Sequence, residues 1–114
     1  MPGAKYLANS FSLGMLSKLP AVVKIEEVPK EVFCREIRNA ISVIGHEGTA
    51  QIITNLCSVP VTVNRSAVQL NKGDIVYVFQ LITRLPEGKI LSMQEIEELI
   101  LQNKVKFMRV EVIE

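Results

Sequence analysis

The chain has 114 residues, of which 48% are hydrophobic and 5% aromatic, and it contains no tryptophan. This length is enough to bury one core, which must be built mainly from Ile, Val and Leu. The 13 basic and 12 acidic residues leave a net charge of +1, which argues against a protein that binds long duplex DNA. A small anionic ligand is still compatible with this charge, because such a ligand needs only a few local donors.

The first half of the chain has the hydrophobic spacing of alternating strands and helices. In chain order the pattern predicts a strand at 4–8, a brief helix at 13–19, a strand at 21–28, a helix at 30–41 and a helix at 49–57. Pro29 is expected to open the longer of these helices, because its fixed φ suits the first turn. The small-residue turn Gly45–Gly48 precedes the last helix, and Thr49 is its expected N-cap.

The second half predicts further strands and one more helix. In order we expect extended segments within 59–70, a turn at 71–74, a strand at 74–85, a helix at 93–103 and a strand at 105–113. The run 74–85 is the most apolar and is rich in β-branched residues, so it is expected to be the central strand. Ser92 and Glu95 form a capping box. Together these elements predict a single α/β domain over 1–114, a mixed sheet of about five strands flanked by three or four helices.

The two cysteines, Cys34 and Cys57, each fall on the apolar face of a predicted helix. This placement is typical of buried free thiols in a reducing compartment, so we expect free thiols, with a disulfide as the less favoured alternative. The start of the chain lacks a signal-peptide core, and no apolar run approaches the roughly 18 residues of a membrane span. We therefore expect a soluble, cytoplasmic protein with no membrane partner.

His46 is the only histidine in the chain, and it lies in the turn that precedes the helix at 49–57. Gly45 and Gly48 allow a ligand or backbone to approach closely. The unpaired N–H groups and positive dipole end of the following helix suit a phosphate. A lone histidine is also commonly structural or simply exposed. His46 is thus a candidate proton donor to a phosphodiester. The alternative is that it has a structural role or is simply exposed.

Polar residues also follow the first strand, where Asn9, Ser10 and Ser12 occupy the segment NSFS. Ligands of open α/β sheets bind at the carboxyl ends of strands, which makes these side chains candidate ligand contacts. The alternative is a plain turn that contains a helix N-cap.

The late part of the strongest strand carries Gln80 and Arg84, which share one face of a regular strand. Polar groups within an apolar strand must be satisfied, so Arg84 either pairs with Glu87 or binds phosphate as a forked donor. Arg65 is a weaker candidate, because a solvated surface arginine is its default interpretation.

Metal and cofactor sites have little support in the sequence. One histidine and two remote cysteines match no zinc spacing, and no carboxylate cluster has the pattern of a hard-metal site. The chain has no G-x-S-x-G, which disfavours a serine hydrolase, and no Walker or dinucleotide fingerprint. We therefore expect neither a metal nor a cofactor.

The pieces YLANSFS, FC, IGHEGT, NLC, NR, RLPEGKILS and VKFMRVEVI occur in this order over nearly the whole chain, from about Lys5 to the C-terminus. Their order and spacing resemble the viral anti-CRISPR ring nuclease family, small proteins of archaeal viruses, phages and mobile elements. Members of that family are compact α/β homodimers that bind cyclic tetra-adenylate, a messenger of type III CRISPR systems, across the dimer interface. They cleave it without metal. The resemblance implies the same activity here, in the host cytoplasm if the protein is viral.

The resemblance also implies roles for individual residues. His46 is the implied general acid, Arg84 would stabilise the charge that develops on the phosphoryl oxygens, and Glu87 would orient His46 or balance Arg84. The expected ligand contacts are Asn9, Ser10, Ser12, Gly45, Thr49, Arg65 and Gln80. The implied reaction is in-line attack of a ribose 2′-hydroxyl on its neighbouring phosphorus, which leaves a 2′,3′-cyclic phosphate.

Three other classes of function stay open. A non-catalytic cyclic-nucleotide-binding protein, acting as sensor or sponge, would use the same pocket and would bind the ring without turnover. A small dimeric DNA-binding regulator would show salt-sensitive binding to duplex DNA. A purely structural interaction module would show no change of melting temperature with any nucleotide.

Overall fold

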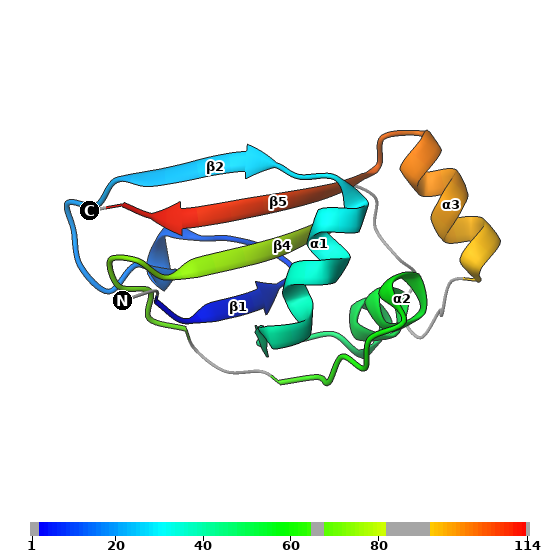
Figure 1. The fold of residues 1–114 in the computed structure, drawn as a ribbon, viewed down its shortest axis with the longest axis horizontal. Helices are drawn as coiled ribbons and strands as arrows, with labels where there is room; N and C mark the ends of the chain where they lie inside the picture. The colour runs from blue at the N-terminus through cyan, green and yellow to red at the C-terminus, as the bar shows by residue number, and fades with distance from the viewer. Residues whose placement is uncertain (1–2, 65–67, 82–91, 114) are drawn as a thin grey trace.

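The computed structural model describes residues 3–64, 68–81 and 92–113, and its strands form one mixed sheet in the order β2-β5-β4-β1-β3 (Figure 1). The strands are β1 (Lys5–Ala8), β2 (Val23–Glu27), β3 (Ile41–Ser42), β4 (Ile75–Leu81) and β5 (Val105–Val112). β1 pairs in parallel with β3 and β4, whereas β5 pairs antiparallel with β2 and β4. The carboxyl ends of β1, β2, β3 and β4 therefore meet at one edge of the sheet, called the carboxyl edge below.

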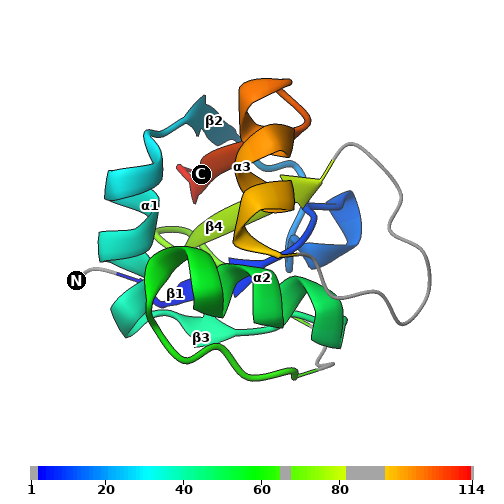
Figure 2. The same cartoon turned by 90° about the vertical axis from the view of Figure 1, so that its right-hand side faces the viewer.

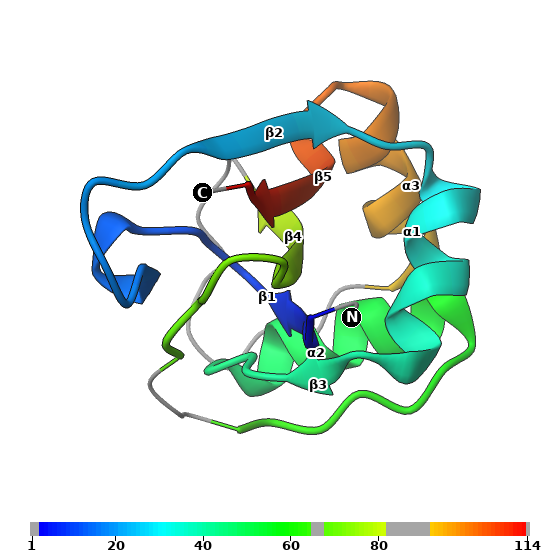
Figure 3. The same cartoon turned by 60° about the vertical axis from the view of Figure 1, so that its left-hand side comes forward.

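The α-helices cover one face of this sheet, and a short 3₁₀ helix lies on the other (Figure 3). The helices are α1 (Lys30–Glu36), α2 (Glu47–Cys57) and α3 (Met93–Leu101), with 3₁₀ turns η1 (Leu13–Met15) and η2 (Ile37–Asn39). The core on the helix side includes Phe33, Phe79 and Phe107, whose rings lie 5.0–6.4 Å apart. Val76 and Val78 belong to the core on the other face. β4 is thus buried on both faces, as its continuous apolar run predicts.

The predicted architecture is confirmed as a compact mixed α/β domain, in which the described residues form five strands and three α-helices. The run 74–85 contains the central strand, and its last residues lie outside the described part of the chain. The predicted capping box is also present, because Ser92 N donates to Glu95 Oε1 and Glu95 N donates to Ser92 Oγ, each at 3.2 Å.

The predicted helix at 30–41 is too long, and the short strand β3 was not predicted. α1 ends at Glu36, and the chain then passes through η2 into β3. Ile41 and Ser42 pair with β1, and the N–H of Val43 donates to Leu7 O at 2.8 Å. Pairing with β1 therefore overrides the helical pattern at the end of this segment.

The predicted helix at 13–19 is also shorter, since only η1 forms. The backbone at the end of η1 and just after it instead forms hydrogen bonds with a distant segment. Leu70 N donates to Met15 O at 2.6 Å, and Ser17 N donates to Leu70 O at 3.0 Å. These bonds fix Leu16 and Leu70 in an isolated parallel bridge. A contact between such remote residues has no signal in the local sequence.

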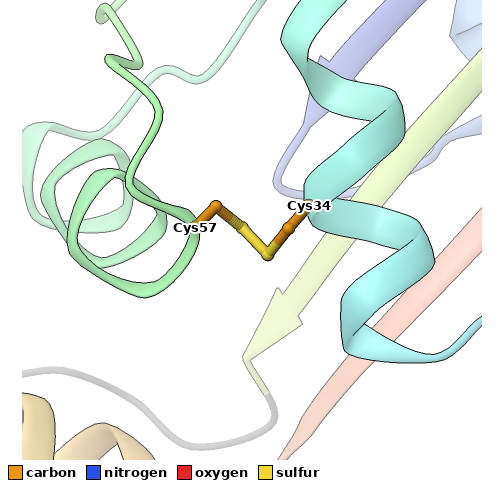
Figure 4. Close-up of a disulfide and its surroundings, with 2 residues drawn as sticks. All are labelled: Cys34 and Cys57. Atoms are coloured by element: carbon orange, nitrogen blue, oxygen red, sulfur yellow. A yellow bond between two sulfur atoms is a disulfide. The ribbon is translucent and has the colours of Figure 1, made fainter.

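The expectation of free thiols at Cys34 and Cys57 is wrong. The two sulfur atoms form a disulfide with a Cα–Cα distance of 5.0 Å, which joins α1 to the last residue of α2 (Figure 4). Both residues were correctly placed on apolar helix faces, but these faces meet in one helix–helix contact, which spacing along the chain does not reveal. Disulfides also occur in intracellular proteins of hyperthermophilic archaea, so the bridge does not by itself assign a compartment.

Asp74 organises the turn that leads into β4. The residue is 7% exposed, and its carboxylate accepts hydrogen bonds from Ala4 N at 3.0 Å and from Asn71 N at 2.9 Å. Asp74→Ala would leave both amides without this acceptor, and we expect it to lower the free energy of unfolding by about 2 kcal/mol. Urea denaturation measures this loss. Glu97→Ala, an exposed change on α3, is the matched control, and an equal effect of the two substitutions would contradict this role of Asp74.

Lys5 and Glu36 join β1 to the end of α1. Lys5 Nζ donates to Glu36 Oε2 at 2.9 Å, and this hydrogen bond lowers the pKa of Glu36 below its usual value. The pair therefore stabilises the fold at neutral pH, and its contribution is lost as the pH falls through the lowered pKa. Both side chains are partly exposed, so Lys5→Met should cost only about 0.5 kcal/mol in a urea titration at neutral pH. The cost should vanish in acid, whereas a cost independent of pH would contradict this account.

Candidate functional site

Three chain segments with candidate residues meet at the carboxyl edge, which faces the viewer in Figure 2. Asn9 and Ser10 directly follow β1, His46 follows β3 by a few residues, and Gln80 is the penultimate residue of β4. The parallel pairing of β1 with β3 and β4 directs these segments to one end of the sheet. The candidates Arg65, Arg84 and Glu87 lie outside the described residues.

His46 is the N-cap of α2, and its side chain is exposed. Its carbonyl accepts the first helical hydrogen bond from Ala50 N at 3.0 Å, while its side chain makes no capping bond. The expectation that Thr49 caps this helix is wrong, because α2 begins at Glu47 and Thr49 lies inside its first turn, half-buried. The imidazole and the free N–H groups of that turn therefore lie together at the start of α2.

The segment before His46 is fixed on both sides. Its hydrogen bonds are donated by Val43 N to Leu7 O (2.8 Å), by Asn64 N to Ile44 O (2.8 Å) and by Asn64 Nδ2 to Ser42 O (2.9 Å). β1 thus holds one side and the chain around Asn64 holds the other. Asn64, which precedes Arg65 and was not predicted as a site residue, supports the turn through its backbone and side chain. A turn held in this way places His46 reproducibly at the carboxyl edge.

The segment after β1 forms a turn rather than a regular element. Asn9 is half-buried, whereas Ser10 and Ser12 are exposed. Ser12 is the N-cap of η1, and its N–H donates to Met15 Sδ at 3.3 Å. Ser12 therefore occupies the N-cap position that the simple interpretation predicted. Its hydroxyl and that of Ser10 are exposed and accessible to a ligand.

Gln80 lies on the sheet face opposite the α-helices, because it alternates with Phe79, which belongs to the helix-side core. Its partner in the β4–β5 ladder is Lys106. Lys106 was not predicted as a site residue, and its ammonium group donates to Glu27 Oε1 at 2.9 Å. The alternation of side chains along β5 predicts the sheet face on which Lys106 lies. Only the register between β4 and β5 shows that its neighbour is Gln80.

A cavity of about 320 Å³ opens where β2 ends and β5 begins. Among the described residues it is lined by Glu27, Val28, Asn103, Val105, Lys106 and Phe107, and none of the described candidate residues belongs to this lining. Within residues 3–64, 68–81 and 92–113, no group of three or more His, Cys, Asp or Glu side chains is placed to hold a metal ion. In the same part of the chain, no helix is long and apolar enough to cross a bilayer.

This sheet and its carboxyl edge define an α/β domain of a class found in archaeal viruses. The chain belongs to the STIV B116-like family, which matches residues 5–109. It is 33% identical over 103 residues to the ORF116 protein of Acidianus filamentous virus 1, covering 89% of each chain. It is likewise 33% identical over 97 residues to protein 26 of Sulfolobus islandicus filamentous virus, covering 82% of each.

The fold of the family is known from a solved structure, B116 of Sulfolobus turreted icosahedral virus. That structure matches with a TM-score of 0.89 and 33% identity, over 96% of this chain and 99% of that one. The kinship to proteins of archaeal viruses expected from the sequence is therefore confirmed at the level of the family and the fold.

Proposed function

We propose that this protein is a metal-independent ring nuclease that opens cyclic tetra-adenylate and thereby counters type III CRISPR signalling in the cytoplasm of an infected host. The observation that carries the proposal is the position of His46, exposed at the start of α2 on the edge that also holds Asn9 and Gln80. A proton donor, neutral hydrogen-bond donors and free helix N–H groups suit a phosphodiester. The choice of cyclic tetra-adenylate as the ring rests on the sequence resemblance to the ring nuclease family.

The chemistry is a transesterification within the ligand. The ribose 2′-oxygen forms a bond to the adjacent phosphorus as the bond from phosphorus to the 5′-oxygen breaks. The 2′-hydroxyl gives up its proton to solvent water, and His46 in its protonated form donates one to the departing 5′-oxygen. The product carries a 2′,3′-cyclic phosphate and a 5′-hydroxyl. Asn9 and Gln80 hold the 2′-oxygen, the phosphorus and the 5′-oxygen in line. They contribute alignment and form no covalent bond to the ligand.

A ring with repeated phosphates is matched by a two-fold dimer, because each copy supplies one His46 and symmetry places the second opposite the first. The sheet face without α-helices supports such an assembly, since it retains exposed apolar side chains. Ile25 and Ile41, both on this face, are 54% and 52% exposed. A second copy that covers them would bury apolar surface.

The test combines binding and turnover on the same sample. Calorimetry with cyclic tetra-adenylate should give one ring for every two chains, and chromatography should show that substoichiometric protein consumes the ring. Tight binding without loss of the ring would instead favour the sensor or sponge, a candidate supported by the helix N–H groups and neutral donors alone. Absence of both binding and turnover would overturn both candidates.

A further inference from the structure

Beyond the end of β2, the described residues provide no strand on the side of Val105 that faces away from β4. Val28 N donates to Phe107 O at 2.9 Å, after which the chain turns at Pro29 into α1. In an antiparallel ladder every second residue directs its N–H and C=O to the same neighbour. Val105, two residues before Phe107, therefore directs its N–H and C=O toward the side that β2 has left. This places a backbone donor and acceptor at the wall of the cavity of about 320 Å³.

The other walls of this cavity combine apolar and charged groups. Val28 and Phe107 provide apolar surface, while Asn103, Glu27 and Lys106 provide polar groups. Lys106 Nζ donates to Glu27 Oε1 at 2.9 Å, and the two side chains are 45% and 68% exposed. The volume lies at the lower end of the range of small-ligand sites, and the exposed surface of the cavity is mostly polar.

The geometry points to a nucleotide site in this cavity, in which the base pairs with the backbone of Val105 and the phosphate binds Lys106. The Watson–Crick edge of a base presents a donor beside an acceptor, which complements the N–H and C=O of one extended residue. The base lies in the plane of the sheet, beyond Val28 and next to Val105, where a longer β2 would have paired with β5. The choice of adenine rests on the proposed function, because Lys106 is the ladder partner of Gln80 and the cavity adjoins the carboxyl edge.

Lys106 exchanges partners when the nucleotide enters. Its ammonium moves from the Glu27 carboxylate to the phosphate, and the freed carboxylate accepts hydrogen bonds from ribose hydroxyls. Both side chains are exposed enough for this exchange to need no rearrangement of the core. The site thus adds a cation and a base contact to an edge whose other described candidates, His46 apart, are neutral.

The test is amide NMR of the isotope-labelled full chain, titrated separately with adenosine monophosphate, adenosine and inorganic phosphate. Adenosine monophosphate and adenosine should both shift the Val105 amide, and phosphate alone should not. Lys106→Met should weaken the binding of adenosine monophosphate by about tenfold and should leave the affinity for adenosine unchanged. Lys24→Met, an exposed change on the same strand as Glu27, is the control and should alter neither.

A Val105 amide that adenosine monophosphate does not move would overturn the inference, as would equal affinity of wild type and Lys106→Met for that nucleotide. These outcomes leave the proposed function intact if wild type still opens the cyclic ring. Conversely, an adenosine monophosphate site at Val105 in a protein that neither binds nor opens the ring would refute the nuclease and keep the nucleotide site.

Discussion

Substitution of His46 by alanine is expected to slow opening of cyclic tetra-adenylate by about 10²- to 10⁴-fold, the usual contribution of a general acid. The departing 5′-oxygen is a poor leaving group unless it is protonated, and His46 is the only histidine in the chain. Because its side chain makes no capping bond to α2, its removal should leave the fold and ligand binding nearly unchanged. Single-turnover rates and calorimetric affinities measured on the same preparation separate these two effects.

Glu47→Gln is the matched control for His46→Ala. Glu47 is the adjacent exposed residue and lies in the first turn of the same helix, so a general disturbance of this turn would affect both variants. We expect the control to retain a rate close to that of wild type. Equal rates for wild type and His46→Ala would remove His46 from the chemistry, whatever the affinity for the ring.

Loss of the bridge between Cys34 and Cys57 is expected to lower the free energy of unfolding by about 3 kcal/mol. The bridge closes a loop with a sequence separation of 23, and release of such a loop raises the entropy of the unfolded chain by about this amount. The bridge also ties the end of α2, the helix that starts after His46, to α1. Urea unfolding of the oxidised and the reduced protein measures the difference, which should appear as a lower midpoint on reduction.

A variant in which Cys34 and Cys57 are both alanine is the control, since a reducing agent should leave its unfolding midpoint unchanged. If the reducing agent lowers this midpoint as much as that of wild type, the effect does not come from the bridge. An unchanged wild-type midpoint on reduction would contradict the predicted stabilisation.

The parts of the fold that local physics specifies were predictable from the sequence. β4 was found because a continuous run of β-branched and aromatic residues suits a strand buried on both faces. The start of α3 was found because the capping box of Ser92 and Glu95 is a local device. The polar residues after β1 also led to the expectation that Asn9 lies at the carboxyl end of the sheet, where it does lie because the parallel strands share this end. Its role as a ligand contact stays a prediction.

The parts that depend on contacts between distant residues were not predictable. β3 exists because β1 accepts it as a partner, and the bridge of Cys34 with Cys57 exists because two helices pack together. The neighbour of Gln80 is set by the register of β4 with β5, which brings Lys106 beside it. The hydrophobic alternation within each strand predicts which side chains lie on each face of the sheet. The register between neighbouring strands depends on the packing of the whole sheet.

The most direct test of the nuclease is phosphorus NMR of cyclic tetra-adenylate incubated with the wild-type protein in EDTA. The proposed mechanism predicts that the phosphodiester signal of the ring decreases as the signal of a five-membered 2′,3′-cyclic phosphate appears, and that neither change occurs at a comparable rate with His46→Ala. A ring that persists unchanged in the presence of folded protein would contradict the mechanism, as would products without the cyclic phosphate.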